Sequence, residues 1–145
     1  MKKELQSKLF EKYPKIFRQK DLPKQQTAMC WGIDCDNGWF DLIDSLCFCI
    51  QSRVVSQNEK MQKEYDSRPK SLVPYSAKFL ICEATQVKEK FGGLRFYYGG
   101  GDDVIYGMVS LAESMSFKIC ECCGSPGKSE GKRWIRTLCE KCRSI

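Results

Sequence analysis

The sequence predicts an α+β fold, with a long helix and shorter helices packed on a small antiparallel sheet and a C-terminal zinc ribbon. Three observations lead to this prediction. Apolar residues recur at helical spacing between Trp39 and Val54, two strand-forming segments flank the glycines at 92–93, and two Cys-x₂-Cys pairs lie near the end of the chain. The chain has 145 residues, of which 42% are hydrophobic. We therefore expect one core domain, residues 1–117, followed by a small module, residues 118–145.

Two helices are predicted before the strands. The first covers residues 3–12 and ends before a proline, which disrupts a helix interior. Its inward side chains are expected to be Leu5, Leu9 and Phe10. The second is the longest in the chain, and it fades into the polar residues that begin at Gln57. Asp36 or Asn37 is placed to cap it. Its apolar positions repeat every three or four residues: Leu42, Ile43, Leu46, Cys47, Ile50 and Val54.

A β-hairpin and a further helix follow. Strand-forming residues dominate segment 78–88, and residues 94–98 form a second such segment. The glycine pair Gly92–Gly93 predicts a tight turn between them. Asp102 or Asp103 can then cap a helix. The apolar positions of that helix are expected on one inward face: Val104, Ile105, Met108, Leu111, Ala112 and Met115.

Cysteine and histidine usage narrows the classes of function. The chain has 10 cysteines and no histidine. It therefore has no Cys₂His₂ or Cys₃His zinc site, no Ser-His-Asp triad and no Cys-His nucleophile pair. No apolar run is long enough to span a membrane, and the basic N-terminus has no apolar signal-peptide core. We expect a cytoplasmic protein without a membrane partner, whose cysteines are metal ligands and buried thiols rather than disulfides.

The C-terminal cysteines predict a metal site. Cys120 and Cys123 form one Cys-x₂-Cys pair, and Cys139 and Cys142 form a second. Two intervening residues let both thiolates of a tight turn reach the same tetrahedral ion. This double spacing predicts one structural Zn²⁺, with disulfides or an iron–sulfur cluster as the alternatives. Four thiolate ligands leave no position open for water, so a catalytic metal is not expected.

The other cysteines are expected to lie outside this site. Only three residues follow Cys142, so we expect a two-knuckle ribbon rather than a treble clef, in which a helix begins at the second pair. Cys122 is expected to be a spare thiol, because two adjacent cysteines are poorly placed to chelate one ion. Buried thiols or a second metal site are the two interpretations of four more residues: Cys30, Cys35, Cys47 and Cys49. We favour buried thiols, because cysteine often serves as a small apolar residue.

Basic and aromatic residues alternate around the predicted hairpin turn. Positive charge comes from Lys88, Lys90 and Arg95. Tyr97 or Tyr98 supplies a ring on which a base can stack. The amides of the glycine pair are a further candidate contact for an anion. These features favour an anionic ligand, either a nucleotide or a nucleic acid. The alternative is an ordinary surface hairpin, whose glycines only make a turn.

Evidence for catalysis is weak in this sequence. It has no G-x-x-x-x-G-K-[ST] phosphate loop, and the aspartates at 102–103 would repel phosphate from the helix that they begin. A metal-dependent nuclease or phosphoesterase is the catalytic alternative. It would use Asp102 and Asp103 together with Glu83 or Glu89. The absence of histidine ranks this alternative below a non-enzymatic role.

Four stretches of the chain match a recognisable pattern: residues 9–17, 29–47, 86–103 and 119–142. The most specific motif is QVKEKFGGLRFY. On these stretches the chain resembles small proteins encoded by tailed phages and prophages, and the resemblance covers nearly the whole chain. It implies expression in the bacterial cytoplasm during infection and no particular catalytic residues. It also implies the usual tasks of phage accessory proteins: countering host defence, redirecting host machinery or handling phage nucleic acid.

These inferences combine into one functional prediction. We expect a non-enzymatic, zinc-binding protein of phage type that counters host defence by binding an anionic ligand, either a nucleotide signal that it sequesters or a nucleic acid. The alternative is an inhibitor that docks directly on a host defence protein, which an exposed apolar patch would favour. Assembly into a homo-oligomer is compatible with either prediction.

Overall fold

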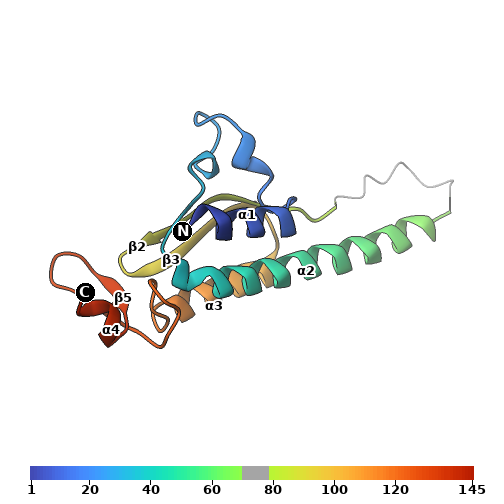
Figure 1. Cartoon of the computed structure of the whole chain (residues 1–145). Helices are drawn as coiled ribbons and strands as arrows, with labels where there is room; N and C mark the ends of the chain where they lie inside the picture. The colour runs from blue at the N-terminus through green and yellow to red at the C-terminus, as the bar shows by residue number, and fades with distance from the viewer. Residues whose placement is uncertain (70–78) are drawn as a thin grey trace.

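The computed structural model describes residues 1–69 and 79–145 and has the predicted α+β architecture (Figure 1). Helices α1 (Lys3–Lys12) and α2 (Phe40–Asp66) pack around a small sheet, and α3 (Asp103–Ser116) lies beside α2. The four-cysteine module lies at one end of the molecule, next to the hairpin turn of the sheet. Three short 3₁₀ helices precede α2: η1 (Arg18–Asp21), η2 (Met29–Trp31) and η3 (Asn37–Trp39).

Within the described residues the main sheet has three strands, in the order β1 (Ile33–Asp34), β2 (Cys82–Lys90) and β3 (Gly93–Gly100). β2 and β3 form the predicted antiparallel hairpin, with Gly92 at φ 79° in its turn. The predicted first strand began earlier, at residue 78, which lies outside the described residues. β1 pairs parallel to β2 and was not predicted, because two residues are too short to show a pattern.

The core lies between the hairpin and the helices. One face of the hairpin contributes Ala84, Val87, Leu94 and Phe96, all of them buried. The predicted inward residue Leu9 of α1 is fully buried, whereas Phe10 is half-buried and packs on the cluster. The largest fully buried side chain is Trp39, which leads into α2. The buried part of α2 agrees with the predicted spacing: Ile43, Leu46, Cys47 and Ile50.

The start of α2 differs from the prediction. Trp39 occupies the N-cap position, and no side chain caps the helix. The prediction that Asp36 or Asn37 would do so is wrong, because both side chains have other partners. Oδ1 of Asn37 accepts a hydrogen bond from the Lys2 amide at 2.8 Å, and Asp36 pairs with Arg136 at 2.7 Å.

α2 also continues beyond Gln57 as far as Asp66, so the expected fading of this helix is wrong. Its polar second half has partners elsewhere in the chain. The Nδ2 of Asn58 donates to the Leu80 carbonyl at 2.9 Å, and its Oδ1 accepts from the Leu80 amide at 2.7 Å. One amide side chain thus satisfies the backbone of the segment that enters β2.

Asp102 caps α3 as predicted. Its Oδ1 accepts a hydrogen bond from the Ile105 amide at 3.0 Å, and its Oδ2 pairs with Arg53 at 2.8 Å. The predicted inward face of α3 is only partly correct. Ile105 and Ala112 are buried, but Leu111 is 63% exposed, and Val104 and Met115 are also exposed. The residues that complete the buried face instead are Val109 and Ser116.

Contacts with the free edge of β3 explain the rotation of α3. The Leu94 amide donates to the hydroxyl of Ser116 at 2.8 Å, and the Phe96 amide donates to Glu113 Oε1 at 2.9 Å. These bonds satisfy donors that an edge strand would otherwise leave unpaired. Because Ser116 must face the strand, Leu111 turns toward solvent.

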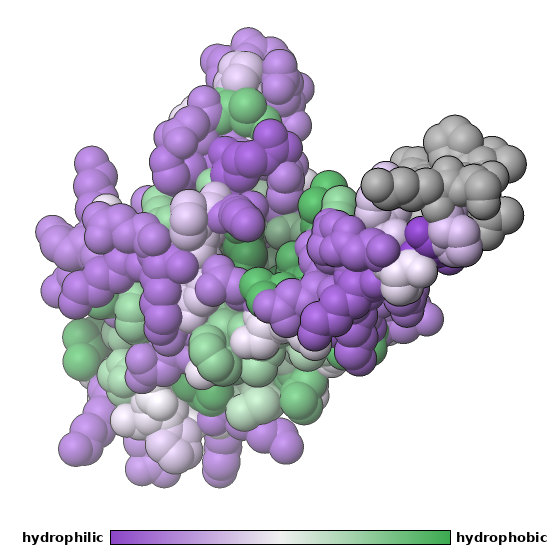
Figure 2. Space-filling view, turned by 90° about the vertical axis from the view of Figure 1, so that its right-hand side faces the viewer, coloured by the Kyte–Doolittle hydropathy of each residue, from purple (hydrophilic) through white to green (hydrophobic). Residues whose placement is uncertain are grey.

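The outward apolar residues of α3 line an open groove against α2. Leu111 and Met115 form one wall, Leu42 and Cys49 form the other, and the hollow has a volume of about 350 Å³. Figure 2 shows apolar residues gathered over the lower part of the molecule, at the level of α2 and α3 in Figure 1. A sizeable apolar surface is therefore left open to solvent.

The hydroxyl of Ser116 provides a direct test of the edge contact. Replacing Ser116 by Ala leaves the buried Leu94 amide without an acceptor, and we expect the free energy of unfolding to fall by about 1–3 kcal/mol. Urea denaturation of the zinc-loaded protein measures this loss. The matched control is Ser114→Ala, on the exposed side of the same helix, which should stay within about 0.5 kcal/mol of the parent. Equal effects of the two substitutions would contradict the proposed role of the bond.

Candidate metal centre and basic surface

The first cysteine pair lies in a tight backbone turn. The Gly124 amide donates to the Cys120 carbonyl at 2.9 Å, and the Cys120 amide donates to the Ser125 carbonyl at 2.7 Å. Gly124 has φ 79°, a conformation that glycine adopts without strain. This turn directs the thiols of Cys120 and Cys123 to the same point, as the Cys-x₂-Cys spacing predicts.

A two-stranded hairpin brings the second pair opposite the first. β4 (Lys128–Glu130) and β5 (Arg136–Leu138) pair antiparallel, and Cys139 follows directly. A one-turn helix, α4 (Glu140–Arg143), then carries Cys142. The expectation that no helix fits at the second pair is wrong, because the helix begins between the two cysteines rather than after them. The module keeps the hairpin of a zinc ribbon and adds a helical turn, as in a treble clef.

The four predicted ligands come together. The Sγ atoms of Cys120, Cys123, Cys139 and Cys142 all lie within 4.8 Å of one another, and Cys123 and Cys139 are 3.6 Å apart. A tetrahedral zinc ion with Zn–S bonds of about 2.3 Å places its sulfur ligands about 3.8 Å apart. The geometry therefore fits one structural metal ion, and the all-thiolate donor set favours zinc. Among the described residues, no other His, Cys, Asp or Glu group is clustered closely enough to hold a metal.

Hydrogen bonding prepares Cys123 to be a ligand. Bonds from the side chain and backbone of Ser125 lower the pKa of the Cys123 thiol to about 6. The pKa of the neighbouring Cys142 thiol changes in the opposite direction, because its hydrogen bonds with Cys123 and Cys139 raise it. A thiol that donates a hydrogen bond to a neighbouring thiolate keeps its own proton more firmly. Zinc binds thiolates, so these hydrogen bonds favour the form of Cys123 that can ligate a metal.

The other cysteines lie outside the cluster. Cys122 is exposed next to the site, as expected for a spare thiol. Cys35 and Cys47 are buried, and burial raises the pKa of Cys35 to about 12, so it stays a neutral thiol. Cys30 is only half-buried. For Cys49 the interpretation as a buried thiol is wrong, because its side chain faces the groove between α2 and α3.

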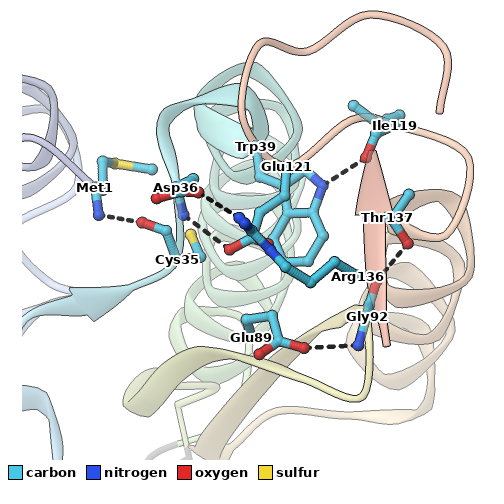
Figure 3. Close-up of polar contacts among 10 residues, drawn as sticks. All are labelled: Met1, Cys35, Asp36, Trp39, Glu89, Gly92, Ile119, Glu121, Arg136 and Thr137. Carbon is cyan, nitrogen blue, oxygen red and sulfur yellow. Dashed lines mark hydrogen bonds and ion pairs between the residues drawn. The ribbon is translucent and has the colours of Figure 1, made fainter. Parts of the chain in front are cut away.

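The first cysteine pair packs against the chain just before α2. The Gly38 amide donates to the Glu121 carbonyl at 2.7 Å, and a Cβ at Gly38 would collide with backbone atoms of Cys120 and Gly124. Next to it, the indole nitrogen of Trp39 donates to the Ile119 carbonyl at 2.9 Å (Figure 3). Only a residue without a side chain allows this close approach.

Charged residues form a second part of this junction (Figure 3). Glu121 is buried, and its Oε1 accepts from the Asp36 amide at 3.1 Å. Arg136 of β5 lies between Asp36 and Glu121, at 2.7 and 3.4 Å from their carboxylates. Burial raises the pKa of Glu121, while the Asp36 amide and Arg136 act in the opposite direction. Sequence reasoning missed these residues, because no local pattern relates position 36 to position 136.

The module also contacts the hairpin turn of the main sheet. The hydroxyl of Thr137, which is fully buried, donates to the Gly92 carbonyl at 2.6 Å. On the other side of the turn, the Gly92 amide donates to Glu89 Oε1 at 2.6 Å. The glycine amides therefore do not point together at an anion, and that part of the prediction is wrong. The turn is instead fixed from both sides.

The cations of the hairpin share the face of the sheet that points away from the core. Lys88 and Arg95 are direct cross-strand partners, and Lys90 is opposite Gly93 on the same face. The guanidinium of Arg95 lies 5.7 Å from the ring centre of Phe117. The sheet thus brings together the three positively charged residues that the sequence singled out.

The two candidate tyrosines lie on opposite faces. Tyr97 is 43% exposed and shares the face of Lys88 and Arg95, because side chains alternate along a strand. Tyr98 is half-buried beside Phe96, with ring centres 6.4 Å apart, and burial raises its pKa. Of the two, Tyr97 is placed to stack with a ligand on the basic face, and Tyr98 packs against the core.

The carboxylates that a metal-dependent nuclease or phosphoesterase would use do not lie together. Glu83 makes a bidentate ion pair with Arg18, at 2.7 and 2.9 Å, and the hydrogen bond from Arg18 lowers the pKa of Glu83. Asp102 caps α3, and Glu89 accepts from Gly92. Among the described residues these groups do not cluster around a common point.

Comparisons with known proteins add no relative: no protein family, curated protein or solved structure matches the chain. Within the described part of the chain, no helix combines the length and the apolar character needed to cross a membrane. Any assignment of function therefore rests on the residues and geometry described above.

Zinc binding is testable ligand by ligand. We expect native mass spectrometry to find one zinc ion per chain. Substitution of Cys123 or Cys139 by Ser should remove this ion, because each variant lacks one of the four thiolate ligands. Cys122→Ser is the matched control and should keep its zinc. A chelator should lower the Tm of the parent and of the control but not that of the zinc-free variants. Loss of zinc from the Cys122 variant would overturn the assignment of ligands.

The close approach at Gly38 predicts a second outcome. Gly38→Ala places a Cβ against the backbone of the cysteine turn, so we expect a loss of about 2 kcal/mol or more in the free energy of unfolding, together with weaker zinc retention. The control is Gly107→Ala within α3, where no heavy atom lies within 4 Å of the added carbon. That substitution should stabilise the protein by roughly 0.5–1 kcal/mol. Denaturation with zinc present measures both, and a tolerated Gly38 variant would refute the contact.

Proposed function

We propose that the protein is a non-enzymatic, zinc-stabilised binding protein that holds an anionic ligand, a nucleotide or a nucleic acid, on the outer face of β2 and β3. The observation that carries this proposal is the strand register, which pairs Lys88 with Arg95 and leaves Tyr97 exposed beside them. Two adjacent cations with an aromatic ring suit a phosphate group and its base. Within the described residues, neither Lys88 nor Lys90 forms an ion pair, so both charges are available to a ligand.

A binding role is favoured over catalysis by the chemistry of the polar groups. The metal site is filled by four thiolates and offers no position for substrate or water. The chain has no histidine, and its candidate acids are engaged in ion pairs and backbone contacts. A nuclease or phosphoesterase needs either clustered carboxylates for Mg²⁺ or a general base.

The proposed setting is a bacterial cell under infection. The resemblance to proteins of tailed phages motivates this part of the proposal, together with the cysteine-rich composition, which suits a reducing cytoplasm. There, sequestering a nucleotide signal or covering a nucleic acid would counter host defence. The basic face needs no catalytic residue for either task.

The apolar groove between α2 and α3 favours a second candidate function. Leu111 and Met115 are both exposed and line this groove. An inhibitor that docks on a host defence protein would use such a surface, since apolar side chains dominate the centre of protein interfaces. This second function needs no small ligand, so the two candidates are separable by substitution.

A double substitution tests the main proposal. We expect Lys88→Ala/Arg95→Ala to weaken binding of a nucleotide and oligonucleotide panel at least 10-fold, because each charge-assisted contact contributes about 1.5–3 kcal/mol. Isothermal titration calorimetry measures the affinities. The matched control is Lys3→Ala/Lys8→Ala on the exposed side of α1, which removes the same net charge elsewhere.

The same variants decide between the two functions. If the Lys88/Arg95 variant binds the whole panel as tightly as the parent, the main proposal is wrong. If it also retains its effect on phage infection, and Leu111→Ser/Met115→Ser abolishes that effect, the docking function takes its place.

A further inference from the structure

Three segments meet at the glycine pair of the hairpin turn. A Cβ at Gly92 would lie 2.9 Å from both Ile135 Cγ2 and Ser129 Oγ, which belong to the hairpin of the zinc module. A Cβ at Gly93 would collide with the ring of Phe117, which follows α3. The sheet, the exit of α3 and the zinc module are therefore in direct contact at this point, and the absence of side chains at Gly92 and Gly93 allows it.

The loop between β4 and β5 lies beside this junction, since Ile135 belongs to it. The residues just before Ile135 are Lys132, Arg133 and Trp134, and all three are exposed. Trp134 is 72% exposed, a large fraction for the largest apolar side chain. Phe91, in the hairpin turn itself, is 69% exposed. The two segments that meet at Gly92 therefore each carry an exposed aromatic ring next to the contact, Phe91 in the turn of the sheet and Trp134 in the loop of the zinc module.

The charge around the junction is strongly positive. The cations on these segments are Lys90, Arg95, Lys118, Lys128, Lys132 and Arg133. Negative groups are fewer. Glu89 accepts from the Gly92 amide, Asp34 lies beside Lys88 across the β1–β2 pair, and Glu130 is paired with Arg143 at 3.7 Å. A surface of this kind attracts a polyanion and is poorly suited to an uncharged partner.

We propose that this composite surface binds single-stranded nucleic acid, with the outer sheet face as one half and the zinc-module loop as the other. The inference rests on the proposed function and narrows its ligand. From Tyr97 to Gly92 the chain runs about 17 Å at ~3.3 Å per residue, and the loop that carries Trp134 adjoins its far end through the contact of Ile135 with Gly92. A mononucleotide is too short to reach both halves, whereas a strand of several nucleotides spans them.

The exposed rings favour a single strand over a duplex. Tyr97, Phe91 and Trp134 can stack only on bases that are free of their own stacking partners. In this arrangement the zinc ion positions one half of the binding surface. Its hairpin is held against the sheet by the bond from Thr137 to the Gly92 carbonyl, at 2.6 Å. Losing the metal should therefore weaken oligonucleotide binding more than mononucleotide binding.

The test uses fluorescence anisotropy of the zinc-loaded full chain with a labelled oligothymidine of about 12 nucleotides, and thymidine monophosphate as the short probe. We expect Trp134→Ala to weaken oligothymidine binding roughly 5- to 150-fold, the effect of losing one base–aromatic stack, with little change for the monophosphate. Lys132→Ala/Arg133→Ala should reduce the slope of log K against log salt by about 1.4, from two lost phosphate contacts.

A matched control exists for the tryptophan. Trp31 is 74% exposed but lies beside α1, lining a hollow with Gln6 and Phe10. Trp31→Ala should leave oligothymidine binding unchanged. The side chains of Trp31, Lys132, Arg133 and Trp134 are exposed, and those of Lys88 and Arg95 are half-buried. Zinc content by native mass spectrometry verifies that each variant keeps its zinc module, and an unchanged Tm verifies that it keeps its fold.

The outcomes separate this inference from the proposed function. If Trp134→Ala and Lys132→Ala/Arg133→Ala bind oligothymidine as the parent does, while Lys88→Ala/Arg95→Ala loses both probes, the composite surface is wrong and the sheet-face ligand is short. Equal affinity for a duplex of the same length also overturns the preference for a single strand. If Lys88→Ala/Arg95→Ala changes neither probe, the proposed function fails together with the inference.

Discussion

The contact between Gly38 and the cysteine turn is the constraint on which the rest of the structure depends. A C-terminal segment of this size is too small to fold on a core of its own, so we expect its shape to depend on a metal ion held by the four cysteines and on the residues that it packs against. At Gly38 the backbone of the turn approaches so closely that no side chain fits, and the Gly38 amide binds the Glu121 carbonyl. The next residue, Trp39, is the largest buried side chain and leads into α2. The metal turn and the longest helix therefore share one anchor.

The charged residues around Glu121 make the contact between the zinc module and the start of α2 specific for one orientation. A buried carboxylate destabilises a fold unless hydrogen bonds and an opposite charge compensate it. Glu121 receives the Asp36 amide, and Arg136 joins it to Asp36. A hairpin docked in another register would leave Glu121 buried and unpaired. The cost of that alternative, more than the strength of the ion pairs themselves, selects the observed orientation of the zinc module.

The difference between what sequence reasoning found and what it missed follows from the range of the interactions. Helix α1, the β-hairpin, the Asp102 cap and each pair of the four-cysteine cluster have signals within a few residues, and all were predicted. The misses depend on distant partners. Asp36 does not cap α2 because Arg136 engages it, and α3 is rotated because Ser116 serves the edge of β3. β1 exists only through its pairing with β2, and its two residues carry no periodicity.

Four thiolates around one metal ion leave no position open for a substrate, so the contribution of this site to the proposed binding would come from where it lies. The hairpin that joins the two cysteine pairs is pressed against the turn of the main sheet, where Thr137 binds Gly92. Any ligand that spans the sheet face and the zinc-module loop depends on this relative placement, because a rigid surface loses less entropy on binding than two independent segments. A metal ion bound by the four cysteines would therefore act at a distance from the proposed ligand, by holding two basic and aromatic surfaces in a fixed relative position. If the ligand binds across both surfaces as proposed, a metal site that lies outside the binding groups still contributes to affinity through their rigidity.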